Sequence, residues 1–96
     1  MRYAARADEN QKEIMSAIRQ LGADCVTLHR LGQGAPDLLV PFAGVWTVAE
    51  LKTDNGIFTP RQVQWHERFG YYAPIEIWHS WQEAIDYLMA LKVMRA

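Results

Sequence analysis

The sequence predicts a single α/β domain built on a mixed sheet with a helix at its C-terminal end. Three observations indicate this class: an amphipathic helical segment comes first, three strand-like segments follow, and a second helical segment separates these from a fourth strand. The 96 residues suffice for one hydrophobic core. Half of them are hydrophobic and 22% are charged, an ordinary balance for a folded, soluble domain.

The first helix is expected from Asp8 to Leu21, and Gly22 is a suitable residue for its end. Its polar and apolar residues alternate with helical spacing, so one side should face the core. The residues of that side are Asn10, Ile14, Ala17, Ile18 and Leu21.

Three strands are expected next. Residues Cys25–Leu31 alternate and are rich in strand-forming side chains, and Asp37–Val40 begins a second strand after a glycine-rich interruption. A short turn leads into the third, Val45–Lys52. Because the third strand is almost continuously apolar until Glu50, it is expected to be buried on both faces.

A turn signal, Thr53–Gly56, separates the third strand from a second helix. Thr59 is the expected N-cap of that helix, Pro60 its first residue and Gln62 the partner that completes a capping box. The helix is expected to end near Phe69, which is followed by glycine.

A fourth strand is expected at Pro74–Trp78, and Ser80–Glu83 has the pattern of a second capping box. The last helix begins there. Its apolar side is expected to contain Trp81, Ile85, Leu88 and Met89.

Composition excludes several classes of protein. No apolar run approaches the roughly 20 residues needed to cross a bilayer, and the polar first ten residues lack the apolar stretch of a secretion signal, so we expect a cytoplasmic location. Cys25 is the only cysteine, which rules out an internal disulfide and favours a buried thiol. The net charge of −1 argues against a dedicated DNA-binding domain, because such domains are usually basic.

Three polar residues converge in the expected sheet. Side chains on a strand alternate between faces, so Glu50 and Lys52 point to the same side of the third strand. Antiparallel pairing brings the beginning of the second strand, where Asp37 lies, next to the end of the third. Two carboxylates close together suit Mg²⁺ or Mn²⁺. A structural ion pair is the simpler alternative, but burying two acids with one base gains little stability.

The runs Gly34-Ala35-Pro36-Asp37 and Glu50-Leu51-Lys52 resemble the PD-(D/E)xK nuclease signature. Together with Thr59-Pro60-Arg61-Gln62, Trp65 and His66, they resemble the VRR-NUC branch of that superfamily. The resemblance covers most of the chain and implies a restriction-endonuclease-like α-β-β-β-α-β core. It also implies a metal-dependent DNA endonuclease, acting on branched DNA as a homodimer in the manner of a Holliday-junction resolvase.

By this resemblance, Asp37 and Glu50 match the metal-binding acids, the backbone carbonyl of Leu51 a further ligand, and Lys52 the catalytic lysine. Gln62 matches the downstream glutamine of the family. Its place in a capping box is the competing interpretation, and one amide was not expected to serve both roles fully.

The family also places a glutamate on the first helix, for which Glu13 is favoured over Glu9 because it lies nearer the core-facing side. An exposed helical acid is the ordinary alternative. His66 could orient water or contact phosphate, although helix packing is the more common role.

DNA contacts are expected from Arg30 and Arg61, which flank the candidate site in the sequence. Two other interpretations stay open: a catalytically silent DNA-binding module of the same fold, and a small protein-interaction domain, which the charge would suit.

Overall fold

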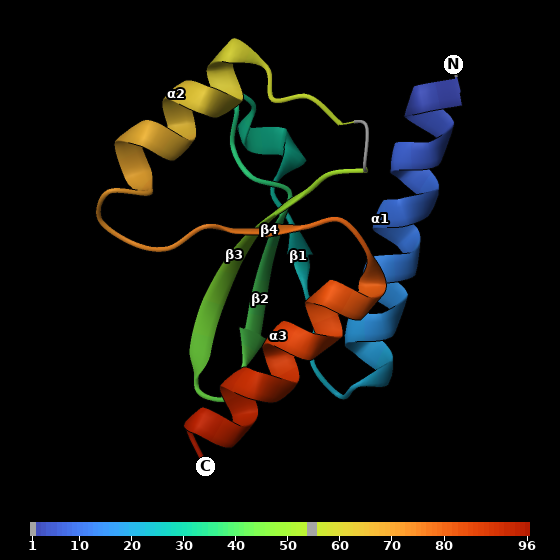
Figure 1. Ribbon diagram of the computed structural model, residues 1–96, viewed down its shortest axis with the longest axis vertical. Coiled ribbons are helices and arrows are strands. Elements are labelled where there is room, and N and C mark those ends of the chain that lie inside the picture. The colour runs from blue at the N-terminus through green and yellow to red at the C-terminus, as the bar shows by residue number, and fades with distance from the viewer. Residues whose placement is uncertain (1, 54–55) are drawn as a thin grey trace.

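The computed structural model describes residues 2–53 and 56–96, with side chains from residue 7 onward. It is an α/β domain with a four-stranded mixed sheet and a C-terminal helix (Figure 1). The element order is the expected one, with a short 3-10 helix added. The elements are α1 (Arg2–Gln20), β1 (Val26–Thr27), η1 (His29–Leu31), β2 (Leu38–Phe42), β3 (Val45–Leu51), α2 (Pro60–Phe69), β4 (Glu76–Trp78) and α3 (Trp81–Met94).

The strands lie in the order β1-β2-β3-β4. Neighbouring strands are antiparallel except β3 and β4, which are parallel and are joined by the crossover that contains α2. The β2–β3 turn has positive φ angles at Ala43 and Gly44, as a two-residue hairpin turn requires. In the expected turn after β3, the Gly56 N–H donates to the Thr53 carbonyl, while Asp54 and Asn55 lie outside the described residues.

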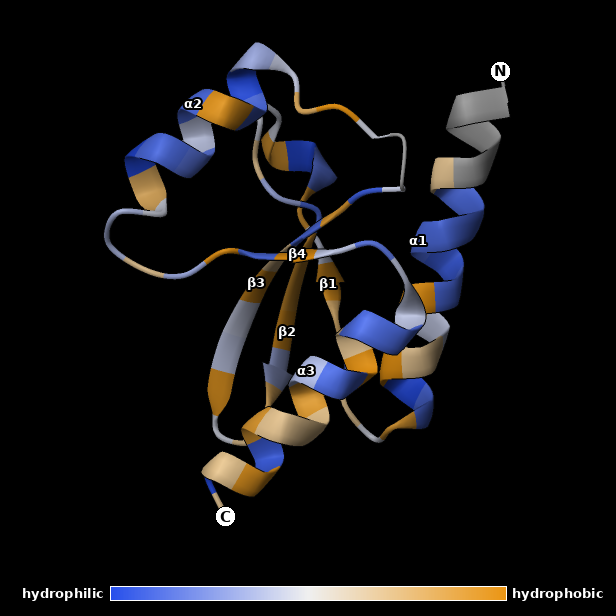
Figure 2. Cartoon of the chain, in the orientation of Figure 1, coloured by the Kyte–Doolittle hydropathy of each residue, from blue (hydrophilic) through white to orange (hydrophobic). Residues whose placement is uncertain are grey.

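The core lies between the sheet and the pair α1 and α3, which pack against each other. The predicted inner side of α1 is confirmed, because Ile14 and Ile18 are completely buried. Figure 2 shows mostly hydrophilic residues along α1 with hydrophobic ones among them, and mostly hydrophobic residues on β1 and β2. The buried residues of the core are Ile14, Ile18, Cys25, Leu38, Val40, Ala49, Trp78, Ala84 and Leu88.

The first strand is much shorter than predicted. The Leu28 N–H still donates to the Asp37 carbonyl, but the Leu31 N–H then donates to Leu28, which closes a turn of 3-10 helix. His29 and Arg30 therefore lie in η1 rather than on a strand. The alternating sequence is compatible with a strand or with a turn. The chain turns back toward β2 at this point, and the turn of 3-10 helix therefore replaces the rest of the strand.

The expectation that the third strand is buried on both faces was wrong. Trp46 keeps 63% of its surface exposed, because α1 and α3 cover only the other face of the sheet. Trp46, Val48 and Glu50 alternate with buried Thr47 and Ala49 and so share the outer face. Of these three, only Glu50 is fully buried, at the end of the strand where α2 lies.

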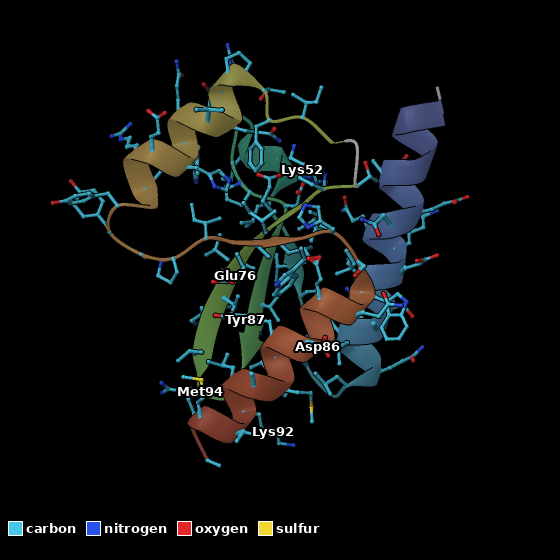
Figure 3. All side chains as sticks on the ribbon, in the orientation of Figure 1. Lys52, Glu76, Asp86, Tyr87, Lys92 and Met94 are labelled. Carbon is cyan, nitrogen blue, oxygen red and sulfur yellow. The ribbon has the colours of Figure 1, made fainter. Side chains whose placement is uncertain are left out.

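The predicted apolar side of the last helix was also wrong in part. Trp81 and Met89 are 43% and 42% exposed, whereas Ala84 and Leu88 are completely buried. Ala84 places a small side chain inward, and Tyr87, labelled in Figure 3, packs its ring 5.8 Å from that of Trp78. The inner side of the helix is therefore rotated relative to the prediction.

The start of α3 differs in detail as well. The Ser80 hydroxyl accepts from the Glu83 N–H as expected of an N-cap. The Glu83 carboxylate, however, accepts from the His79 N–H, so the capping box is not reciprocal.

The loop before β2 lies directly against the start of α2. Gly34 has a φ of +82°, and a Cβ atom there would overlap the carbonyl group of Arg61 and the backbone nitrogen of Gln62. Glycine is therefore required twice, by conformation and by space. The contact holds the loop that leads to Asp37 against the helix that carries Gln62.

Replacing Gly34 with alanine should lower the free energy of unfolding by on the order of 2–4 kcal/mol, because strain and steric overlap add. Gly44→Ala is the matched control: φ there is also +82°, but the added Cβ meets only the Arg95 guanidinium, at 3.8 Å, which is an ordinary contact. It should cost only about 1–2 kcal/mol. Urea denaturation of both variants measures the difference, and equal losses would contradict the close contact.

Candidate functional site

Asp37 lies at the point where β2 begins, and it is fixed by three backbone-directed hydrogen bonds. Its N–H donates to the Ala49 carbonyl at 3.0 Å, and its own carbonyl accepts from Leu28. Its carboxylate oxygen Oδ2 accepts from the Leu51 N–H at 2.7 Å. The antiparallel pairing of β2 with β3 thus places this carboxylate beside the end of β3, as the sequence predicted.

Glu50 is the buried acid of the site, with only 1% of its surface exposed. Burial raises its pKa to about 9, and the neighbouring Asp37 carboxylate adds to the rise through hydrogen bonding and repulsion. The Lys52 ammonium, 4.0 Å from Glu50 Oε2, opposes the rise only in part. At neutral pH and without a cation, Glu50 therefore keeps its proton.

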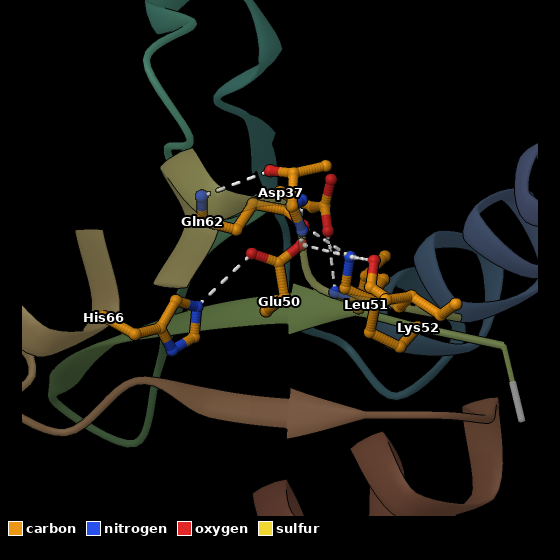
Figure 4. A network of polar contacts seen from close by, with 8 residues as sticks. Asp37, Glu50, Leu51, Lys52, Gln62 and His66 are labelled. Carbon is orange, nitrogen blue, oxygen red and sulfur yellow. Dashed lines mark hydrogen bonds and ion pairs between the residues drawn. The ribbon is translucent and has the colours of Figure 1, made fainter. Parts of the chain in front are cut away.

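Lys52 turns its ammonium into the same site. Its Nζ donates to Gln62 Oε1 at 2.7 Å and to the Ile57 carbonyl at 3.4 Å. It also lies 4.7 Å from the centre of the Phe58 ring, a cation–π distance. Figure 4 shows the ammonium beside the carboxylate pair, held by groups from the loop and the helix that follow β3.

Gln62 completes the capping box and also contacts Lys52 and Glu50. Its Oε1 accepts from the Thr59 N–H at 2.9 Å, which completes the capping box, and from Lys52. Its Nε2 donates to Glu50 Oε2 at 3.3 Å. The expectation that one amide could not satisfy both sets of partners was wrong. The carbonyl oxygen has two lone pairs, one for Thr59 and one for Lys52, and the amide nitrogen can donate to Glu50 at the same time.

His66 is a contact that sequence reasoning underrated. It follows Gln62 by four residues, so both lie on one side of α2. Its Nε2 lies 3.4 Å from Glu50 Oε1, and its ring stands edge-on to Phe58 at 5.1 Å. Burial and the charge of Lys52 lower the pKa of His66, so the ring is neutral at pH 7 and the contact with Glu50 is a hydrogen bond rather than an ion pair. The helical spacing from Gln62 was the available signal.

Glu13 does not join the carboxylate pair. It is exposed and lines a groove of about 640 Å³ between α1 and α3, together with Trp81 and Ile85. One residue along a helix is a rotation of about 100°, so the neighbour of inward-facing Ile14 points aside. Glu9 is exposed too, and the inward position at its level belongs to Asn10, which donates to the His79 carbonyl.

The side chains of the described residues contain no group of three His, Cys, Asp or Glu that could hold a metal ion. The site therefore offers two carboxylates, Asp37 and Glu50. The Leu51 carbonyl is a third possible ligand: on a strand the N–H and C=O of one residue point to the same side, and its N–H points to Asp37. Arg30 in η1 and Arg61 in the first turn of α2 are exposed on the two segments that flank this pair in sequence.

Comparisons with known proteins found no relative: no protein family matches the chain, and no curated protein or solved structure matches it. Within residues 2–53 and 56–96, none of the helices has the length and apolar character needed to traverse a bilayer. The structure defines an α/β domain with two neighbouring carboxylates, of which Glu50 is buried, and a lysine at the end of its sheet.

The raised pKa of Glu50 predicts how stability depends on pH in the metal-free protein. Folded Glu50 holds a proton up to about pH 9, whereas the unfolded chain releases it near pH 4.5. The folded state thus binds more protons between these values, and the free energy of unfolding should fall as pH rises through that window. Glu50→Gln should match the wild type near pH 4 and exceed it at pH 8 by on the order of 2–5 kcal/mol.

Urea denaturation in EDTA at several pH values measures this effect. Glu13→Gln is the control, since it removes an exposed carboxylate outside the site and should keep the wild-type pH dependence. A Glu50→Gln variant that loses stability at pH 8 would show that the buried acid is charged in the folded protein.

Proposed function

We propose that this chain is a metal-dependent endodeoxyribonuclease of VRR-NUC type, with a restriction-endonuclease-like core. The observation that carries the proposal is the buried carboxylate of Glu50, next to Asp37 and within 4.0 Å of the Lys52 ammonium. These are the residues that match the PD-(D/E)xK signature. The element order and the mixed sheet are compatible with the core that the signature implies.

The donor set fits Mg²⁺ or Mn²⁺. Both are hard cations that bind oxygen, and Mg²⁺ is commonly held by one or two carboxylates while water and substrate phosphate fill the other positions. Burial, and then the neighbouring Asp37 carboxylate, raise the pKa of Glu50 to about 9, and a divalent cation held by these acids would favour the ionised form of Glu50 again. Such a cation supplies Lewis acidity toward a phosphoryl oxygen and the attacking water.

The residues around the carboxylates have distinct tasks in this proposal. Lys52 presents a fixed positive charge, held by Gln62 and the Ile57 carbonyl, to the negative charge that develops on the phosphate during attack. Gln62 hydrogen-bonds to both Lys52 and Glu50 and so fixes the positions of these two side chains relative to each other. Arg30 and Arg61 would contact phosphates on either side of the scissile bond.

The net charge of −1 leaves one subunit with little general attraction for DNA. A homodimer would double the number of phosphate contacts and suit a branched substrate. The outer face of the sheet supports such an assembly, because Trp46 and Val26 are 63% and 53% exposed there and exposed apolar surface of this kind commonly marks an interface.

Nicking of supercoiled DNA and of four-way junctions tests the chemistry. Cleavage should require Mg²⁺ or Mn²⁺, stop in EDTA, and fall by roughly 100- to 1,000-fold in Lys52→Ala, which removes the charge facing the phosphate. Lys12→Ala removes a lysine of α1 that lies outside the site and should cleave at the wild-type rate.

Equal cleavage by the wild type and Lys52→Ala would reject this mechanism. Tight DNA binding without cleavage under either metal would instead favour a catalytically silent DNA-binding module. The absence of both would favour a small protein-interaction domain.

Sedimentation equilibrium tests the dimer. The wild type should sediment as a dimer and Trp46→Glu as a monomer, because a charge at the centre of an apolar interface is left unpaired. Val93→Glu is the matched control, since Val93 is 73% exposed on α3, the helix that covers the opposite face of the sheet, and should leave the dimer intact. A monomeric wild type would contradict the assembly.

A further inference from the structure

Both oxygens of the Glu50 carboxylate are held by one helix. Gln62 Nε2 lies 3.3 Å from Oε2, and His66 Nε2 lies 3.4 Å from Oε1 (Figure 4). The two side chains are one helical turn apart on α2, which gives them a common direction. Glu50 itself comes from β3, so the carboxylate bridges strand and helix.

The His66 ring is held in place by burial and by the Phe58 ring. Its side chain is only 19% exposed, and the Phe58 ring stands against it at an interplanar angle of 83°. When Glu50 is an ionised ligand its oxygens can only accept, so the imidazole must carry its proton on Nε2 and donate to Oε1. This donor limits rotation of the carboxylate about its last bond.

We propose that His66 is a positioning residue that orients the Glu50 carboxylate for binding a divalent cation. The inference rests on the proposed function, because it assumes that Glu50 is a metal ligand. Hydrogen-bonding partners of metal ligands fix the ligand's orientation, and their loss commonly weakens metal binding by roughly 10- to 100-fold. Asp37 has its own such partner in the Leu51 N–H, so each acid of the pair is held by a donor outside the pair.

Two substitutions separate this role from simple packing. His66→Phe keeps an aromatic ring against Phe58 but removes the donor. His66→Gln loses the ring but places an amide N–H near the position of Nε2. Positioning predicts that glutamine preserves metal binding and phenylalanine does not, whereas a packing role predicts the reverse.

Calorimetric titration of Mn²⁺ into metal-stripped protein without DNA is the test. His66→Phe should weaken Mn²⁺ binding by roughly 10- to 100-fold, and His66→Gln should stay within about threefold of the wild type. In cleavage assays, His66→Phe should need more Mn²⁺ but approach the wild-type plateau at saturation. Circular dichroism confirms folding; should His66→Phe fail to fold, His66→Met is the donor-free partner of His66→Gln.

The Mn²⁺ titrations have three distinguishable outcomes. Wild-type affinity in His66→Phe, or equal weakening in the glutamine and donor-free variants, would overturn the positioning role while leaving the nuclease proposal standing. A wild type that binds no Mn²⁺ would overturn both. Loss in the donor-free variant together with retention in His66→Gln supports the role.

Discussion

A single buried carboxylate, that of Glu50, determines how this end of the molecule is assembled. An acid removed from water must stay protonated or find compensating partners. Here Glu50 keeps its proton at neutral pH, and its partners are Gln62, His66 and Lys52. None of the ten residues of α2, all within the described range, is fully buried. The helix is therefore held to the sheet largely through the polar groups that surround Glu50, together with the backbone contact at Gly34.

The carboxylate pair was predictable because it depends on local rules. Strand alternation placed Glu50 and Lys52 on one face, and a short hairpin turn returned the chain so that Asp37 met them. The start of α2 was equally clear, since Thr59 and Gln62 form the expected capping box. These features follow from neighbours in sequence, or from strands joined by a tight turn, and need no knowledge of how distant elements pack.

The remaining features depend on packing between distant elements. The sequence showed an apolar third strand but not that helices would cover only one face, so the exposure of Trp46 was missed. The same limit applies to α3, whose inner side contains Ala84 rather than Trp81. For the site, the rotation of α1 excluded Glu13, and the contact of His66 with Glu50 required the docked position of α2.

The close backbone contact at Gly34 bears on whether α2 can move relative to the carboxylate pair. The loop that leads to Asp37 lies against Arg61 and Gln62 with no room for a side chain, and Asp37 is bonded in turn to Ala49 and Leu51 of β3. The loop before β2 therefore contacts both α2 and β3. The helix α2 is accordingly a fixed wall of the site and not a lid, so the DNA substrate proposed above would have to enter without any movement of this helix.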